Sequence, residues 1–346
     1  MRAARSLCLA GSAIALCLPA AAHADVIVGP RLAYYFDNSN LRTSSIAGGV
    51  QEEGGAIDQA SFEFAQDLLG PDLQLTTQQE GIGVLADQIA IPMVGAMVNF
   101  GDDRDRFTIS ALYGEGEGRF SQTQAISRVL SFRERQAVDF GVATVGADFD
   151  YTRIDIEATW QRRTSENFAI LAGFRYERLE RSGTGETGIG LTPNVDNFLD
   201  ELVSEELGIN PGEPFEQRPL FKLPIADTGT QETFSARAGV TAFVPINENA
   251  TAFFNGMVHT SLQPEFSTRT QFFLNGEVAG NDLVEDNARE FSVGPDFAVG
   301  AQFVLSDSLA LDVRYRANIF FPLSGDQSFS DARVNHGVNV GLSLRL

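Results

Sequence analysis

Residues 167–180 read NFAILAGFRYERLE, and the side chains of this stretch alternate between two kinds. One set of alternate positions is apolar throughout and consists of Phe168, Ile170, Ala172, Phe174 and Tyr176. The other set mixes small and charged residues and includes Arg175 and Glu177. Successive side chains of a β-strand point to opposite faces, so the stretch predicts a strand with one apolar and one charged face. A soluble sandwich would suit such a strand, and so would a barrel with lipid outside and a polar interior.

Residues 1–24 have the pattern of a secretory signal peptide. A charged start precedes a mostly apolar run, and Ala22-His23-Ala24 has the small-x-small form of a cleavage site. The apolar run is short for a membrane anchor. Both cysteines of the sequence fall in this segment. We therefore expect the mature chain, residues 25–346, to be exported without disulfide bonds.

Beyond residue 24, no apolar run approaches the ~20 residues that a membrane-spanning helix requires. Strict two-residue alternation recurs instead. The predicted strands are Val26–Phe36, Gln88–Gly101, Phe107–Glu115, Phe149–Gln161, Phe168–Leu179, Phe234–Ile246, Ala250–Thr260, Phe291–Leu305, Leu309–Phe321 and Val334–Leu346. Most have about 10–14 residues, which is long for soluble strands but suits tilted membrane strands. Aromatic residues near the strand ends predict girdles at the two membrane surfaces: Phe36, Phe107, Trp160, Phe168, Phe291 and Phe321.

The connections between these strands alternate between tight turns and long loops. The tight turns are Asp102–Arg106, Arg162–Asn167, Asn247–Asn249 and Ser306–Ser308. The long loops are Asp37–Asp87, Gly116–Asp148, Glu180–Thr233, Ser261–Glu290 and Pro322–Arg333. This sorting predicts an all-β fold: one closed antiparallel up-and-down transmembrane β-barrel of about ten strands, spanning residues 25–346, with short turns in the periplasm and long loops outside.

Helical spacing predicts a short helix in each of two long loops. Asn194–Gly208 carries an apolar stripe between two capping residues, and Ala60–Leu69 is followed by Gly70-Pro71. A short amphipathic helix needs an apolar partner, and we expect the helices to fold over the barrel mouth.

Two segments resemble bacterial outer-membrane β-barrel proteins: IDIEATWQRRTSENFAILAGFRYERLE at residues 154–180 and HGVNVGLSLRL at residues 336–346. The first resembles a transmembrane hairpin with a Gly-aromatic-Arg-Tyr pattern. The second resembles the terminal strand read by the outer-membrane assembly machinery, although it ends in Leu346 rather than an aromatic residue. The resemblance implies location in the outer membrane, with the lipid bilayer, lipopolysaccharide and the assembly machinery as partners. It implies no catalytic residue.

Charged residues occupy the inward phase of several predicted strands. They are Arg31, Arg153, Asp155, Glu157, Arg175, Glu177, Arg237, Asp296, Asp312, Arg314, Arg316 and Arg345. Opposite signs on neighbouring strands, such as Glu177 with Arg237 and Asp296 with Arg316, predict an ion-pair network inside a barrel small enough to be filled by side chains. Two functions stay open: a structural network that plugs the barrel, or a narrow, cation-favouring channel.

The chain has 46 acidic and 25 basic residues, a formal net charge of −21, which argues against nucleic-acid binding. The acidity gathers in the long loops. A solvated outer face explains it, and a surface binding protein or adhesin is the alternative.

An enzyme is the least favoured class. The omptin proteases are barrels of similar size, but the mature chain offers only His259 and His336, and neither has an evident base and orienting group. Phosphate loops and cysteine metal sites are absent from the sequence, so no cofactor or metal is expected.

Overall fold

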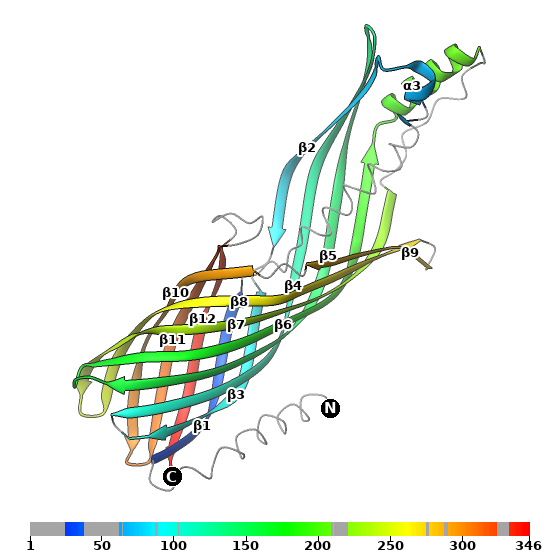
Figure 1. The fold of residues 1–346 in the computed structure, drawn as a ribbon. Helices are drawn as coiled ribbons and strands as arrows, with labels where there is room; N and C mark the ends of the chain where they lie inside the picture. The colour runs from blue at the N-terminus through cyan, green and yellow to red at the C-terminus, as the bar shows by residue number, and fades with distance from the viewer. Residues whose placement is uncertain are drawn as a thin grey trace.

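The computed structural model is β-rich (Figure 1). It describes residues 25–37, 62–63, 65–86, 89–102, 104–208, 210, 221–274, 277–286, 290–323 and 332–346. The predicted signal peptide and parts of the long connections lie outside the described residues.

Within the described part of the chain, twelve strands form one antiparallel sheet. Their bounds are β1 (Asp25–Asp37), β2 (Leu73–Ala86), β3 (Ile89–Gly101), β4 (Asp105–Phe132), β5 (Arg135–Arg163), β6 (Phe168–Leu191), β7 (Phe221–Asn247), β8 (Ala250–Leu274), β9 (Glu277–Asp286), β10 (Glu290–Ser306), β11 (Leu309–Pro322) and β12 (Arg333–Arg345). One helix, α3, spans Asn194–Leu207, and residues 62–63 and 65–69 are also helical. None of the described helices has the length and hydropathy of a membrane span.

Ten of these strands close into a barrel. The ring runs β1-β3-β4-β5-β6-β7-β8-β10-β11-β12, and β12 pairs with β1 to close it. The four predicted tight turns lie between β3 and β4, β5 and β6, β7 and β8, and β10 and β11. They gather at the end of the barrel where β1 begins and β12 ends (Figure 1). The predicted up-and-down barrel of about ten strands is therefore confirmed.

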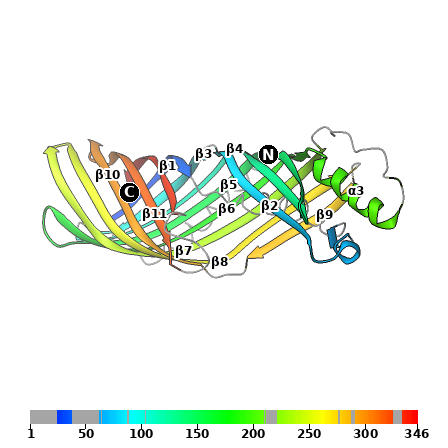
Figure 2. The same cartoon turned by 90° about the horizontal axis from the view of Figure 1, so that it is seen from above.

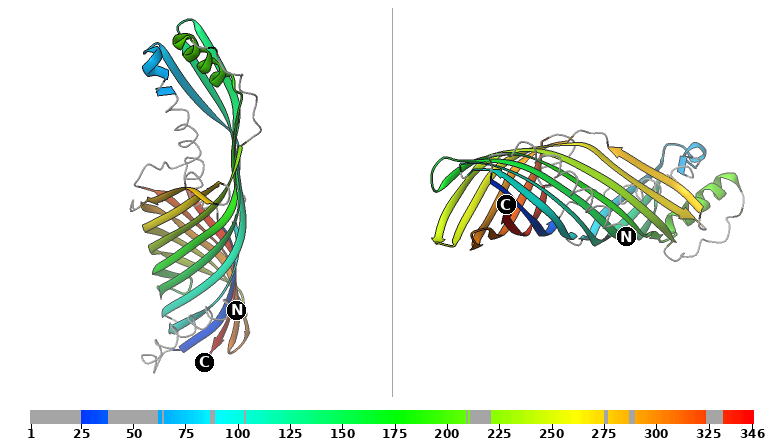
Figure 3. Two further views of the ribbon diagram at one scale, coloured as in Figure 1. Left: turned by 90° about the vertical axis from the view of Figure 1, so that its right-hand side faces the viewer. Right: turned by 90° about the horizontal axis from the view of Figure 1, so that it is seen from below.

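Strands β4 to β7 continue far beyond the ring on one side. β4 and β5 have 28 and 29 residues, whereas β1 and β3 have 13 each. At about 3.3 Å per residue, the longer strands project roughly 50 Å past the ring. We call this projection the arm: β2, α3 and residues 118–132, 135–149, 183–191 and 221–227. Figures 1 and 3 show it rising from one wall of the barrel, and the view from above in Figure 2 shows α3 at the end remote from the ring.

The arm corrects the prediction of a long loop at Gly116–Asp148. That segment is a β-hairpin, and parts of the other predicted loops are also strands, including β2 and β9. The two-residue alternation continues through β5, but the two faces exchange their character. The inward face is charged as far as Arg153 and becomes apolar in the arm, as at Phe149. The outward face is apolar at Ile156 and becomes polar in the arm, as at Asp148. Lipid surrounds the barrel and water surrounds the arm, so the same strand needs opposite patterns in its two halves. The strands predicted from the sequence are shorter than the observed ones because the prediction followed only the apolar outward residues of the barrel.

The outside of the barrel is apolar. Large exposed side chains cover it, among them Leu32, Val94, Ile156, Phe174, Val240, Val258, Val299 and Val338. The band ends on β6 at Tyr176, whose hydroxyl donates a 3.0 Å hydrogen bond to Glu232, and the next outward residue, Arg178, pairs with Glu180. A tyrosine with an apolar body and a hydrogen-bonded tip is typical of the membrane surface. On β6, Tyr176 therefore marks the upper limit of the lipid-facing band.

α3 packs at the tip of the arm and not over the barrel mouth, so the predicted location of the helix is wrong. Its apolar stripe joins the hairpin turn of β4 and β5 in a small core of Ala65, Leu73, Leu130, Phe132, Val195, Phe198 and Leu202. The predicted helix itself is confirmed, and Gly208 ends it with a left-handed φ of 66°. Asn194 is not its N-cap. The carboxylate of Asp139 on β5 accepts from the N–H of Val195 at 3.0 Å and takes that role across the tertiary contact.

Replacing Asp139 with Ala is expected to detach α3. The carboxylate is fully buried, accepts from Arg128 at 2.6 Å and from the Thr192 hydroxyl at 3.1 Å, and caps the helix. Its loss removes the 2.6 Å partner of the buried Arg128, while the partly exposed Asp196 stays 3.3 Å away. A change of this type costs about 3–5 kcal/mol, localised at the tip. Hydrogen exchange of the α3 amides is the measurement.

The matched control for that experiment is Glu205→Ala, which removes an exposed pair with Arg135 from the same helix. Exposed pairs contribute about 0–1 kcal/mol, so α3 exchange should hardly change. Equal protection in the Asp139→Ala and Glu205→Ala variants would contradict the capping role.

The turn between β3 and β4 predicts a local pH dependence. The Asp102 carboxylate accepts from the N–H groups of Asp105 at 2.7 Å and Arg104 at 2.8 Å, and these bonds lower the pKa of Asp102 below 3.8. A depressed pKa means that this stabilisation is present above pH 3.8 and is lost as pH falls through the folded value. We expect the protection of the Arg104 and Asp105 amides, relative to their intrinsic exchange rates, to fall as pH drops below 3.8. In an Asp102→Asn variant, which cannot titrate, this acid step should vanish; if it persists, another group causes it.

Candidate functional site in the barrel interior

The inside of the barrel carries a network of buried ion pairs in two groups. The first group lies around Arg153 on β5, which is completely buried. Arg153 donates to Asp37 on β1 and to Glu177 on β6, each at 2.9 Å, and its guanidinium lies 5.0 Å from the ring centre of Tyr35. Arg333 on β12 contacts the same two carboxylates, at 3.1 Å to Asp37. Two arginines therefore share two acids.

Arg175 on β6 completes this first group. It donates to both oxygens of Asp155 on β5, at 2.9 and 2.5 Å, and lies 3.0 Å from Glu177. The two parallel bonds form the bidentate geometry that a planar guanidinium favours with a carboxylate. All three side chains are buried. The pattern of residues 167–180 thus places a charged pair where the interior neutralises it.

The second group consists of two arginines and two acids from four strands. Arg316 on β11 binds Asp296 on β10 at 2.6 Å and Glu157 on β5 at 2.5 Å. Arg237 on β7 binds the same two acids, at 3.0 and 2.7 Å, and donates to Thr159 at 2.9 Å. Each acid again accepts from two arginines, so the carboxylate oxygens are well satisfied.

Two contacts cross the full width of the barrel. Arg316 and Glu157 come from β11 and β5, which lie five steps apart in a ring of ten. Arg333 and Glu177 come from β12 and β6, which are also five steps apart. Side chains on opposite walls can meet only if they bridge the lumen. The two contacts therefore bridge the lumen at two levels.

The ten charges of these two groups cancel. Five are acids and five are arginines: Asp37, Asp155, Glu157, Glu177 and Asp296, with Arg153, Arg175, Arg237, Arg316 and Arg333. Burying a charge without a partner is costly, whereas a neutral, mutually bonded set avoids that cost.

The remaining predicted residues lie towards the short-turn end. Arg31 is 4.0 Å from Asp312 and donates to the sulfur of Met97 at 2.6 Å, while Arg314 lies 3.3 Å from Asp312. Arg345 is exposed at the end of β12, outside the two buried groups, and its place in the lumen network stays a prediction. Arg345 lies two residues beyond the buried Ser343 on the same phase of β12, at the edge of the barrel.

The structure changes some of the predicted partners. Arg237 lies across from Gly173 and not from Glu177, so that predicted pairing is wrong, because the register between β6 and β7 separates them. Asp37 and Arg333 belong to the network, although the sequence pattern predicts both of them in loops. The signal was present: each continues the inward phase of its strand by one further alternate position.

The two histidines lie in different surroundings. His259 on β8 is buried, its ring centre is 4.4 Å from that of Phe320, and Arg237 lies opposite it. His336 is on the outward face, where its Nδ1 lies 3.0 Å from the Tyr315 hydroxyl and its ring stacks on Phe36. Among the described residues, no group of three or more His, Cys, Asp or Glu side chains is arranged to hold a metal ion.

These features define the class of protein. A closed barrel satisfies every strand edge of the ring, presents an apolar band outside and holds paired charges inside, which is the architecture of a bacterial outer-membrane β-barrel.

No protein-family model and no curated protein matches the sequence. Among solved structures, the chain is similar to the outer membrane protease OmpT from Escherichia coli, with 9% identity over 93% of this chain and 96% of that chain and a TM-score of 0.36. It is also similar to the translocator domain of the autotransporter NalP from Neisseria meningitidis, with 10% identity, coverage of 100% and 95%, and a TM-score of 0.27. A Pseudomonas aeruginosa FadL homologue has 8% identity, coverage of 92% and 89%, and a TM-score of 0.25.

Proposed function

We propose that this protein is a non-enzymatic outer-membrane barrel with a sealed lumen, and that the barrel anchors the arm as a binding element at the cell surface. The observation that carries the proposal is the pair of contacts across the lumen, Arg316 with Glu157 and Arg333 with Glu177. Buried side chains that bridge the lumen from wall to wall stand in the way of ions that would pass through it, which supports the seal.

The charge balance favours a seal over a cation channel. A channel that prefers cations uses an excess of carboxylates along its path. Here the five acids are matched by five arginines. Asp37, Glu157 and Asp296 each contact two of those arginines, and Glu177 contacts three. Permeation would need these bonds to separate, with charges left unpaired in the interior.

The arm provides the working surface in this proposal. Its strands are long, its tip has a core of its own, and its outward face is polar where the barrel's is apolar. Surface elements carried by a rigid scaffold are the usual place for binding functions.

Conductance of the refolded full-length protein in planar bilayers tests the proposal. We expect no steady current at neutral pH and moderate salt. Heat-dependent gel mobility of the same sample shows that the barrel has folded. A stable, cation-selective current from folded protein would overturn the seal and favour the narrow channel.

A further inference from the structure

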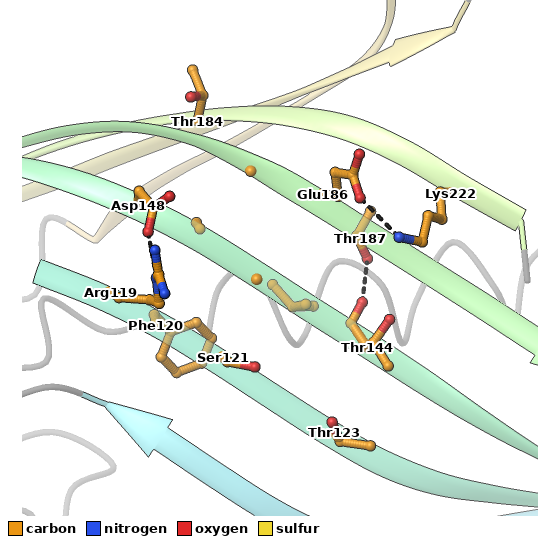
Figure 4. Close-up of a pocket in the computed structure, with 14 residues that line it drawn as sticks. Arg119, Phe120, Ser121, Thr123, Thr144, Asp148, Thr184, Glu186, Thr187 and Lys222 are labelled. Atoms are coloured by element: carbon orange, nitrogen blue, oxygen red, sulfur yellow. Dashed lines mark hydrogen bonds and ion pairs between the residues drawn. The ribbon is translucent and has the colours of Figure 1, made fainter.

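The outward face of the arm continues the lipid-facing wall of the barrel into water. It is hollowed in two adjoining places, of about 450 and 720 Å³, which share Arg119, Asp148 and Thr184. Side chains of β4, β5, β6 and β7 line the upper hollow (Figure 4). The lower hollow lies at the base of the arm, next to the barrel. The ion pairs that seal the lumen make no use of this face.

The lower hollow holds an unfavourable arrangement of charge. Glu117 on β4 and Asp150 on β5 lie directly opposite each other in the register of the two strands, and both side chains are exposed. Like charges in such positions repel each other and weaken the strand pairing. Within the described residues, no ion pair joins either carboxylate to a basic side chain. Asp148 adds a third carboxylate, which Arg119 pairs with at 2.7 Å, so the base of the arm keeps an excess of negative charge.

This excess of charge fits basic side chains. Among the described residues, no three acidic or histidine side chains are arranged to hold a metal ion. The carboxylates follow one another along the strands instead, and alternate positions of β5 are about 6.6 Å apart. A guanidinium or ammonium group on a flexible side chain needs no cage of ligands and binds carboxylates singly or in pairs. A cation placed between Glu117 and Asp150 would also relieve their repulsion.

The upper hollow has room for a polypeptide backbone close to the sheet. A Cβ atom added at Gly146 would meet nothing closer than the Phe120 carbonyl oxygen at 4.0 Å, so the space above this glycine is open. A glycine inside a strand often marks a place where another backbone approaches closely. Glu186 lies beside Gly146 and stays exposed although Lys222 donates to it at 3.0 Å. Hydroxyl groups that can bond to peptide N–H and C=O groups surround this point, at Ser121, Thr123 and Thr144 (Figure 4).

Above the two hollows the same face becomes apolar. The next outward residues of β5 beyond Thr144 are Val142 and Phe140, and the Phe140 ring is 65% exposed. From Asp150 at the base to Phe140 is ten residues, or about 33 Å of extended strand. We call the two hollows together with Val142 and Phe140 the β5 track. Exposed apolar groups beside a polar surface are typical of sites where another protein binds.

An extended polypeptide matches the track in spacing as well as in charge. Every second side chain of an extended chain points the same way, about 6.6 Å apart, as do the outward residues of β5. Basic residues at two alternate positions of such a chain would lie over Asp150 and Asp148. An apolar residue about eight to ten positions further along would reach Val142 and Phe140. The formal net charge of −21 attracts a basic chain from a distance.

We propose that the β5 track docks an extended basic segment of a partner polypeptide. Its basic side chains bind the carboxylates of the lower hollow, its backbone passes over Gly146, and an apolar side chain packs on Phe140. The inference rests on the proposed function of the arm as a binding element and names the chemistry of its partner.

Binding of a synthetic peptide to the full-length protein in an uncharged detergent tests the inference. The probe is a capped peptide of about eleven residues, with arginine at its first and third positions, phenylalanine at its last and serine or glycine elsewhere. Calorimetry measures its affinity. We expect saturable binding that about 0.5 M salt weakens roughly tenfold, because salt screens exposed ion pairs. The same peptide with glutamine in place of both arginines should not bind.

Neutralising the base of the track separates binding from folding. Glu117→Gln with Asp150→Asn removes the repelling pair, so we expect about tenfold weaker peptide binding and a thermal unfolding midpoint that is unchanged or raised. Phe140→Ala should weaken binding roughly threefold. The matched control is Glu201→Gln with Glu205→Gln on α3, which changes the net charge equally but at the tip, where both acids pair with Arg135. It should bind the peptide within about twofold of the unaltered protein.

Several results would overturn the inference. They are no saturable binding below about 1 mM peptide, equal binding of the glutamine peptide, or a loss of affinity in the α3 control as large as in the Glu117→Gln, Asp150→Asn variant. A lower unfolding midpoint in that variant would also do so, because the two carboxylates would then stabilise the arm. Bilayer conductance without peptide separates the two proposals. A silent barrel that binds no peptide removes the track alone, whereas a conducting barrel removes the seal and leaves the binding result intact.

Discussion

Replacing Arg153 with Met is expected to destabilise the barrel by about 3–5 kcal/mol, the cost of breaking a buried ion-pair network from one side. Arg153 is completely buried and bonds to Asp37 and Glu177 at 2.9 Å each. Met keeps the apolar stem but removes the charge, so the neutral network gains a net negative charge in a confined interior. Urea unfolding of protein refolded into lipid vesicles measures the effect as a lower midpoint.

Two variants make this result specific. Arg119→Met removes an exposed pair with Asp148 and should change stability by at most about 1 kcal/mol. Combining Arg153→Met with Asp37→Asn restores neutrality, so the double variant should regain part of the loss, as a positive coupling in a double-mutant cycle. If Arg153→Met unfolds at the same urea concentration as Arg119→Met, the network does not hold the barrel together.

Removal of the contacts across the lumen is expected to open a path for ions. The neutral double variant Glu157→Ala with Arg316→Ala deletes one bridge, and Glu177→Ala with Arg333→Ala deletes the other. Each removes one acid and one base, so the charge balance of the interior is kept. With all four changes the lumen loses the side chains that meet from opposite walls. We expect steady bilayer currents where the unaltered protein gives none.

The control for conductance is a pair of equal size far from the lumen. Arg135→Ala with Glu205→Ala removes an ion pair at the tip of the arm and should remain silent. Gel mobility must show that the fourfold variant still folds as a barrel. A folded fourfold variant without current would show that other groups block the path and that these two contacts are not the seal.

The sequence predicted the strands correctly wherever one face of the strand contacts lipid. Phe168, Ile170 and Phe174 alternate with Leu171, Gly173 and Arg175, and the structure exposes Phe168, Ile170 and Phe174 while burying Arg175. The four tight turns and the ten-stranded ring followed from the same two-residue period. A lipid-facing wall demands apolar residues at every second position, and this constraint is strong enough to be seen without a structure.

The arm was missed because it obeys the opposite constraint. In β5 the outward positions Asp148 and Asp150 are polar and the inward positions Val145 and Phe149 are apolar, as in an ordinary water-exposed sheet. A segment rich in Gly, Ser, Thr and acidic residues on one phase then looks like a loop. The clue was that the alternation did not stop at the membrane boundary but exchanged its phases.

The sequence by itself determined the barrel, the inward phase of most of the charges and the existence of α3, because these depend on local periodicity. Only the tertiary structure decided which charges meet, that Arg316 and Arg333 reach across the lumen, and that α3 rests on the hairpin tip. Ring closure and strand register bring residues more than 150 positions apart into contact, as with Glu157 and Arg316. No local pattern encodes that distance.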